Sequence, residues 1–278
     1  MTTVPDDVKT LLKKVSEDAA EEVLYILLQP FMDVHHTHCV GAEALVRGRV
    51  SGKTLFPDQF IDLMEKNGDI CKVGIFVLER GLQYALDNNL HLRPTFYMSF
   101  NFSPVELNNA ALATEICAII TRLNYPVGKI IIEVTETTVD LTRQGLANVD
   151  RLQRQGIAVA RDDIKSLQDL HIKEAEFSAD VIKLDRSLMN DSQFPEAEAI
   201  ITECQKKSRP IIAEGIEVEA HEKWLLDHDV TVCQGYFYSP PIELDAFSRR
   251  YVNQLVCDNA CGRENCLSLR AAENTLRH

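Results

Sequence analysis

The sequence has no long hydrophobic run, few glycines and prolines, and no excess of basic residues. Its longest apolar stretches, such as Val23 to Phe31, fall well short of the ~20 residues that cross a bilayer, which excludes a transmembrane helix. The start, Met1 to Lys14, carries Asp6 and Asp7 and lacks the basic and apolar regions of a secretion signal. We therefore expect a cytoplasmic protein without membrane insertion.

With 12 Gly and 10 Pro in 278 residues, the composition excludes collagen-like and low-complexity chains. Only 29 Lys and Arg stand against 42 Asp and Glu, giving a net charge of -13. Binding to duplex nucleic acid is disfavoured because phosphate groups require a basic surface. A small anionic ligand is compatible with this charge if bound cations reverse the local field.

The eight cysteines do not form a recognisable zinc pattern. Five are scattered singly and are expected to be reduced thiols: Cys39, Cys71, Cys117, Cys204 and Cys233. The other three, Cys257, Cys261 and Cys266, have a spacing unlike common zinc knuckles, so a tail with incidental thiols competes with a metal or redox cluster. Near Cys39, three histidines are expected to be exposed turn residues rather than metal ligands: His35, His36 and His38.

Short apolar, β-branched runs alternate with segments of helical period, which predicts a largely parallel sheet. Eight runs fit strands: Leu24–Gln29, Val40–Leu45, Thr95–Asn101, Ile130–Glu133, Ile157–Asp162, Asp180–Leu184, Pro210–Glu214 and Thr231–Gln234. Eight strands in this length favour a closed (β/α)8 barrel of the TIM type. The first two strands are joined only by Asp33–Cys39, too short for a helical crossover, so the first strand should be antiparallel to the rest.

Seven segments of helical spacing accompany these strands: Gln59–Lys66, Val73–Asn88, Pro104–Leu123, Thr142–Gln155, Pro195–Lys207, Ala220–Asp227 and Asp245–Val256. Residues 1–22 form a further amphipathic helix that is expected to cap the barrel from beneath. We expect the barrel to cover residues 23–256, followed by a cysteine-containing tail over 257–278.

In such barrels, reacting groups lie at the carboxyl ends of the strands, so the polar residue that ends each apolar run is a candidate. This criterion selects Glu43, Asn101, Glu133, Asp162 with Asp163, Lys183, Glu214 and Gln234. Five carboxylates at one rim repel each other unless they are neutralised, and oxygen ligands of this kind suit Mg2+ or Mn2+. Two such ions can hold a phosphodiester and activate water for in-line attack.

The same residues carry a resemblance to the EAL-domain family of cyclic di-GMP phosphodiesterases. The matching segments are Gln29-Pro30, Glu43-Ala44-Leu45-Val46-Arg47, Asn101-Phe102-Ser103-Pro104, Glu133-Val134-Thr135-Glu136, Asp162-Asp163, Ile182-Lys183-Leu184-Asp185, Ala213-Glu214-Gly215-Ile216-Glu217 and Gln234-Gly235-Tyr236. Their order and spacing follow the family over about residues 24–247.

The resemblance implies hydrolysis of cyclic di-GMP to linear 5′-pGpG in bacterial second-messenger signalling. It implies two Mg2+ or Mn2+ ions bound by Glu43, Asn101, Glu133, Asp162, Asp163 and Glu214, with Glu214 alternatively acting as a base. Lys183 would orient the attacking water or stabilise developing charge. Arg47 would grip a phosphate, and Gln29 and Gln234 would contact ligand or water. Family members commonly dimerise, so a homodimer is expected.

One segment departs from the family. Active members usually continue the aspartate pair with a glycine-rich Phe-Gly-Thr-Gly-Tyr-Ser loop, whereas this chain has Ile164-Lys165-Ser166-Leu167-Gln168-Asp169. Because Lys165 and Leu167 adopt glycine conformations only at a cost, the altered loop is expected to displace Asp163 and weaken the second metal, although the loop-anchoring Glu136 is retained. The alternative is therefore a weak or inactive domain that serves as a cyclic di-GMP receptor or protein-interaction module.

Overall fold

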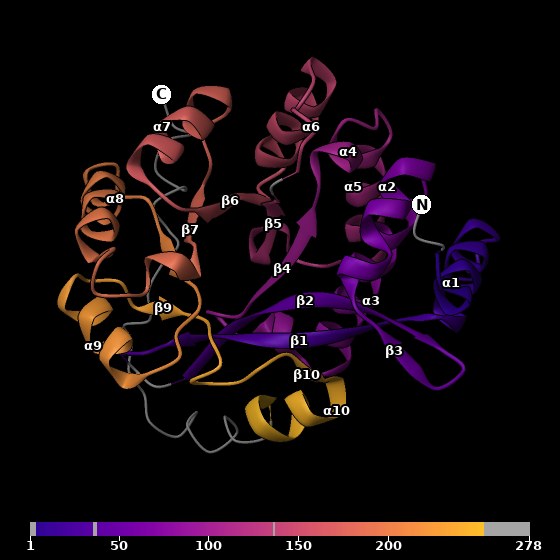
Figure 1. The fold of residues 1–278 in the computed structure, drawn as a ribbon, viewed down its shortest axis with the longest axis horizontal. Coiled ribbons are helices and arrows are strands. Elements are labelled where there is room, and N and C mark those ends of the chain that lie inside the picture. The colour runs from indigo at the N-terminus through magenta and orange to yellow at the C-terminus, as the bar shows by residue number, and fades with distance from the viewer. Residues whose placement is uncertain (1–3, 36–37, 136, 253–278) are drawn as a thin grey trace.

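The computed structural model describes residues 4–35, 38–135 and 137–252. Its helices and strands are α1 Asp6–Ser16, β1 Leu24–Asp33, β2 His38–Val50, β3 Lys53–Leu55, α2 Ile61–Asn67, α3 Ile70–Asp87, β4 Tyr97–Phe102, α4 Pro104–Leu107, α5 Leu112–Leu123, β5 Ile130–Val134, α6 Arg143–Arg154, β6 Ala158–Ile164, α7 Leu167–Glu176, β7 Val181–Leu184, α8 Phe194–Lys206, β8 Ile211–Ala213, α9 Glu219–Asp227, β9 Val232–Cys233, β10 Ile242–Glu243 and α10 Leu244–Phe247. Figure 1 shows the helices arranged around the strands.

Eight of these strands close into a barrel, which confirms the predicted fold. The sheet order is β10-β1-β9-β8-β7-β6-β5-β4-β2-β3, and pairing of β1 with β2 closes the ring. β1 runs antiparallel to both β2 and β9, whereas the pairs from β2 through β4 to β9 are parallel. The short β1–β2 connection imposes this reversal, as the sequence predicts.

Side-chain alternation on the strands places polar residues above an apolar layer. Inward positions alternate with a period of two, so residues two positions apart on one strand both face the barrel interior. Four buried apolar members of the layer lie on the parallel strands β5 to β8, namely Ile131, Ala160, Val181 and Ile212. Two residues after each of them comes one of the polar residues selected from the sequence, in the same order Glu133, Asp162, Lys183 and Glu214. The apolar layer fills the barrel, and the polar layer forms its carboxyl-end mouth.

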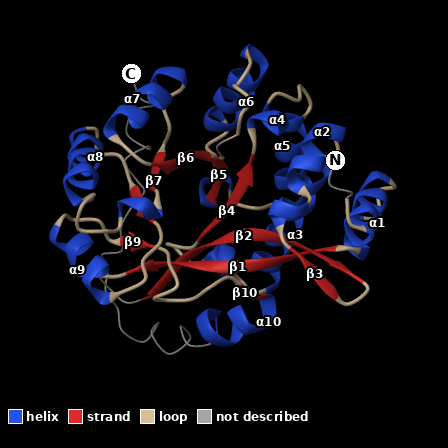
Figure 2. Ribbon diagram, in the orientation of Figure 1, coloured by secondary structure: helices blue, strands red, loops and turns tan. Residues whose placement is uncertain are grey.

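Several elements differ from the sequence expectation. The segment Pro104–Leu123 is divided into α4 and α5, because the Asn148 side chain donates to the carbonyls of Leu107 and Asn109 at 2.8 Å each and holds the chain in a turn there. β3 and β10 are additional short strands at the two ends of the sheet, and α7 is an additional helix (Figure 2).

The N-terminal helix lies beside the barrel rather than beneath it. Leu11 of α1 packs against Gly48, which is five residues beyond Glu43 on β2, and Asp7 forms a 2.7 Å ion pair with Lys53 of β3. These contacts put α1 near the carboxyl-end side, next to the β2–β3 hairpin (Figure 1). Helix α1 can pack this closely against β2 because Gly48 has no side chain.

The C-terminal segment expected as one helix over 245–256 is α10 followed by a π-helical turn, Ser248–Val252. Residues beyond Val252 lie outside the described structure, and so do Cys257, Cys261 and Cys266. The five scattered cysteines are free thiols, as predicted. No helix among residues 4–35, 38–135 and 137–252 is both long and apolar enough to cross a bilayer.

Candidate active site

The carboxyl ends of the barrel strands bring the sequence-selected polar residues together. At the centre lies Lys183, whose side chain is only 1% exposed. Its Nζ is 2.6 Å from Glu133 Oε2, 2.6 Å from Glu214 Oε1, 3.1 Å from Asp162 Oδ1 and 3.8 Å from Glu43 Oε2. One ammonium group thus contacts carboxylates from four different strands or strand ends, at positions far apart in the sequence.

Neutral donors fix the orientation of the carboxylates. Asn101 Nδ2 donates to Glu43 Oε1 at 2.6 Å, and Gln234 Nε2 donates to Glu43 Oε2 at 2.8 Å. Ser99 Oγ donates to Glu133 Oε1 at 2.5 Å. Because both oxygens of each glutamate are engaged, neither carboxylate is free to rotate, and the group is pre-organised before any ligand binds.

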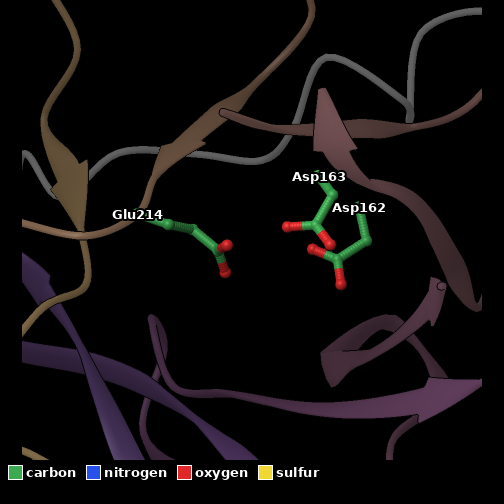
Figure 3. A group of neighbouring side chains, drawn as sticks. All are labelled: Asp162, Asp163 and Glu214. Atoms are coloured by element: carbon green, nitrogen blue, oxygen red, sulfur yellow. The ribbon is translucent and has the colours of Figure 1, made fainter. Parts of the chain in front are cut away.

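Two of the carboxylates that contact Lys183, those of Asp162 and Glu214, also form a group with Asp163. Asp162 and Asp163 at the end of β6 and Glu214 just after β8 offer oxygens that all lie within 4.8 Å of one another. Figure 3 shows the three carboxylates turned toward a shared space. Asp163 therefore stands with its predicted partners despite the altered loop. Lys165 and Leu167 have no positive φ, whereas Asp163 has a φ of 51°.

Burial and the dense negative charge shift several pKa values upward. Burial raises the pKa of Glu133 well above its usual range, against the opposing charge of Lys183. Burial, opposed by Lys183 and reinforced by the charges of Asp162 and Glu43, raises the pKa of Glu214 to about 8. Although burial favours the neutral amine, the surrounding carboxylates raise the pKa of Lys183 well above its ordinary value. The site holds more negative charge than one ammonium compensates.

Asp163 forms a carboxyl pair with Asp185, the first residue after β7. Burial, the charge of Asp162 and a hydrogen bond to Asp185 raise the pKa of Asp163 to about 6. In Asp185 burial is outweighed by hydrogen bonds from Ser187 and Asp163, which hold its pKa below the usual value. Below a pH of about 6, Asp163 is accordingly the member of the pair that carries the proton, whereas near neutral pH both carboxylates are largely ionised.

The remaining candidates lie above or beside this group. Gln29 of β1 is in register with Glu43 and donates from Nε2 to the carbonyl of Ser239 at 3.2 Å. Arg47 is four residues beyond Glu43 on the same face of β2, and its guanidinium carbon is 5.6 Å from the centroid of the exposed Phe56 ring. The loop-anchoring candidate Glu136 lies outside the described residues.

His35 and His38, near Cys39, are remote from this mouth. Asp33 ends β1 and pairs with His38 at the start of β2, which is the opposite end of the barrel from Glu43. His35 is exposed, as predicted, while His38 is half-buried and His36 lies outside the described residues.

Sequence reasoning missed two supporting residues. Ser99 faces the interior two positions before Asn101 on β4, and that spacing was the available signal. Asp185 directly follows β7 in the Ile182–Asp185 segment, but its contact with Asp163 depends on tertiary structure and has no signal of its own in the sequence.

The chain is similar in sequence to longer signalling proteins. An uncharacterized signaling protein of Caulobacter vibrioides is 29% identical over 251 residues, covering 86% of this chain and 30% of that protein. The probable cyclic di-GMP phosphodiesterase PdeN of Escherichia coli is 26% identical over 235 residues, covering 82% of this chain and 45% of that protein. The chain thus spans less than half the length of these curated relatives.

The fold is similar to that of a solved EAL enzyme, Bd1971, in its cAMP- and cyclic-di-GMP-bound form. The TM-score is 0.77 at 20% identity, over 89% of this chain and 70% of that one. The family model for the EAL domain matches residues 13–241, beginning inside α1 and ending beyond β9. Because this match covers most of the 278 residues, the chain belongs to the EAL domain family.

Proposed function

We propose that this chain is a divalent-cation-dependent phosphodiesterase that hydrolyses cyclic di-GMP to linear 5′-pGpG. The observation that carries the proposal is the convergence of four carboxylates on Lys183 at the carboxyl ends of the barrel strands, those of Glu43, Glu133, Asp162 and Glu214. A fifth carboxylate, that of Asp163, lies beside Asp162 and Glu214. Membership in the EAL family and the similarity to PdeN of Escherichia coli, a probable cyclic di-GMP phosphodiesterase, support it.

The residues at this mouth fit divalent cations. Gln234 Oε1 is buried and has no hydrogen-bond donor among the described residues, and the buried Asp162 Oδ1 has only its ion pair with Lys183 at 3.1 Å. The donors are oxygens, which suit Mg2+ or Mn2+ rather than softer metals. We propose that Glu43, Asn101, Glu133, Asp162, Asp163 and Glu214 bind two such ions. When bound, the ions would activate water and neutralise phosphate charge.

Other catalytic roles are assigned to side chains of the protein itself. Lys183 has the geometry of a fixed cation, because four carboxylates surround it, and we assign it to orient the attacking water or stabilise the charge that develops on the phosphate. Asn101 and Gln234 hold Glu43 in one orientation. Glu214, whose pKa is raised to about 8 without a cation, ligates a cation or accepts the proton of the attacking water.

Substrate contacts are assigned to residues beyond the carboxylates. Arg47 offers a planar fork of donors that suits one phosphate of a cyclic dinucleotide. Gln29 and Gln234 carry amides that can both donate and accept, and both lie beside Glu43 at the mouth. The 3′ oxygen of the ribose would leave as the ring opens, so no covalent intermediate with the protein is required.

A second candidate function is a cyclic di-GMP receptor with little turnover. The observation that favours it is Asp163, which has a left-handed backbone and whose carboxyl, beside Asp185, has a pKa raised to about 6. A carboxylate that is harder to ionise is a weaker cation ligand, which would disfavour the second cation. The full set of carboxylates favours the enzyme, because a receptor for an anion has no physical need for such repulsion.

Incubation of the purified chain with cyclic di-GMP and Mg2+ or Mn2+ separates the two functions. The enzyme produces linear 5′-pGpG, and EDTA stops the reaction, whereas a receptor binds the nucleotide and leaves it intact. Glu43→Ala should abolish turnover. Glu243→Ala is the matched control, because Glu243 is exposed and pairs only with Arg49 among the described residues. Binding without product from the unaltered chain would overturn the proposal.

Three further expectations accompany this function. A cytoplasmic location, a homodimer and a division of the chain into residues 1–22, 23–256 and 257–278 stay predictions. Size-exclusion chromatography with light scattering tests the dimer.

A further inference from the structure

The backbone that carries Asp162 and Asp163 departs from regular strand geometry. The pairing of β6 with β7 is irregular between Arg161 and Ile164, and Asp163 has φ 51°. A left-handed backbone costs a non-glycine residue roughly 1–2 kcal/mol, so surrounding contacts must hold it. Lys165 and Leu167, which follow in the chain, have negative φ values. The left-handed conformation of this segment is therefore confined to Asp163.

Lys173 of α7 supplies such a contact. Its Nζ donates to the backbone carbonyls of both Asp162 and Asp163, at 3.3 Å each. The same ammonium is 3.3 Å from Asp169 Oδ2, and the Lys173 side chain is only 17% exposed. A single ammonium group from a helix therefore contacts the backbone carbonyls of two consecutive candidate ligands.

Arg161 on β6 in turn forms hydrogen bonds with residues of α7. Its Nη2 donates to the carbonyl of Lys173 and, at 2.9 Å, to Glu176 Oε2. The guanidinium carbon lies 3.5 Å from the centroid of the Phe177 ring, and the side chain is 5% exposed. Arg161 thus fixes the helix that presents Lys173, so the end of β6 and α7 are tied by two buried or half-buried cations.

The start of α7 is fixed independently. Ser166 Oγ accepts from the Asp169 N–H at 3.0 Å, and the Leu167 N–H donates to Glu196 Oε1 at 2.6 Å. These bonds anchor the first turn of the helix but do not reach the aspartate pair. Of these contacts, the one that joins α7 directly to Asp162 and Asp163 is the ammonium of Lys173.

We propose that Lys173 is a positioning residue for the second divalent cation. By holding the two carbonyls it keeps Asp163 in the left-handed conformation, and this directs its carboxylate toward those of Asp162 and Glu214. The segment after Asp163, Ile164–Asp169, contains no glycine, and in this chain the side chain of Lys173 on α7 holds the backbone of the aspartate pair in place. The inference rests on the proposed function, because it assumes that the three carboxylates bind a cation.

The test measures Mn2+ binding and turnover on the purified full chain. Titration with Mn2+, followed by the electron paramagnetic resonance signal of free Mn2+, counts the sites and gives their affinities. In Lys173→Met we expect one of two sites to weaken by about 10- to 100-fold, as is usual when a group that orients metal ligands is lost. The kcat should fall, while the KM for cyclic di-GMP stays close to that of the unaltered chain.

Two other variants complete the experiment. Lys173→Arg keeps a cationic donor and should recover most of the lost Mn2+ affinity, and it also serves if Lys173→Met does not fold. Lys206→Met is the matched control, since Lys206 is 68% exposed on α8, and it should bind Mn2+ like the unaltered chain.

The outcomes separate this inference from the function on which it rests. Equal Mn2+ affinities at both sites in Lys173→Met and the unaltered chain would overturn the role of Lys173 alone. If the unaltered chain bound two Mn2+ ions but released no linear product, the phosphodiesterase proposal would fail, whereas a weakened site in Lys173→Met would still support the positioning role. An unaltered chain that binds no Mn2+ would overturn both.

Discussion

Lys183 and Glu133 form a fully buried ion pair, with Nζ 2.6 Å from Oε2 and side-chain exposures of 1% and 0%. Removing two charges from water is costly, and such a pair persists only when further hydrogen bonds satisfy both partners. Ser99 satisfies the second oxygen of Glu133, and Glu214 accepts from the other side of Lys183. The pair is the centre around which the other carboxylates gather.

We expect Lys183→Met to abolish turnover and to lower the free energy of unfolding by about 3 to 5 kcal/mol at neutral pH without metal, because it leaves buried carboxylates unpaired. Urea unfolding with and without Mn2+ measures the effect, and added Mn2+ should recover part of the loss. Lys53→Met is the control, since Lys53 is 71% exposed. Unchanged stability in Lys183→Met would show that the ammonium does not compensate the cluster.

The buried carboxyl of Glu106 predicts a pH dependence of stability away from the mouth. Burial raises its pKa from 4.5 to about 8, although the Ser103 N–H donates to Oε2 at 2.8 Å. The folded chain keeps the proton that the unfolded chain releases. The stabilisation is therefore full below pH 4.5 and is lost as the pH rises through about 8.

Glu106→Gln should remove this dependence. Relative to the unaltered chain, the variant should gain stability with rising pH, by at most about 1.4 kcal/mol per pH unit within that window. Urea unfolding at several pH values between the two pKa values measures the difference. Glu115→Gln, an exposed position on α5, is the control. Parallel pH profiles for Glu106→Gln and the unaltered chain would contradict the prediction.

Gly215 directly follows Glu214 and requires the absence of a side chain. Its φ is +67°, and a Cβ built there would overlap Cβ of Arg186. We expect Gly215→Ala to destabilise the fold by at least about 1 kcal/mol and to lower kcat, because relief of the overlap moves the adjacent Glu214. In Gly128→Ala a Cβ would meet open space, so this control should be tolerated. Normal kcat in Gly215→Ala would show that Glu214 is not sensitive to this backbone.

Arg47 is expected to act on substrate binding rather than on chemistry. Arg47→Ala should raise the KM for cyclic di-GMP by about tenfold, the loss of one charge-assisted hydrogen bond, with kcat largely unchanged. Arg49→Ala serves as the control, because Arg49 already stacks on Tyr25 and pairs with Glu243. Steady-state kinetics distinguishes the two constants, and a fall in kcat alone would assign Arg47 a different role.

The barrel and most of its mouth were predictable because the signals are local. Each predicted apolar run carries a polar residue at or near its end, and parallel strands place these ends on one rim, as Glu133 and Asp162 illustrate. The antiparallel direction of β1 also followed from the short connection between the first two strands. No long-range information is needed for either inference.

What could not be predicted depends on contacts between distant segments. The helix α7 has weak apolar periodicity, and its position follows from Arg161 and Glu196, which lie on other elements. Asp163 was expected to be displaced from its local sequence alone, whereas the structure holds it through Asp185 and Lys173. These contacts between distant segments form only when the barrel is folded.

The most direct test of the phosphodiesterase proposal is the origin of the oxygen in the product. The purified chain with Mn2+ is incubated with cyclic di-GMP in oxygen-18 water, and the linear product is analysed by mass spectrometry. Attack by water on one phosphodiester predicts linear 5′-pGpG with a single heavy oxygen on its terminal phosphate, and none from Glu43→Ala. Intact cyclic di-GMP, or a linear product without the heavy oxygen, would contradict the account.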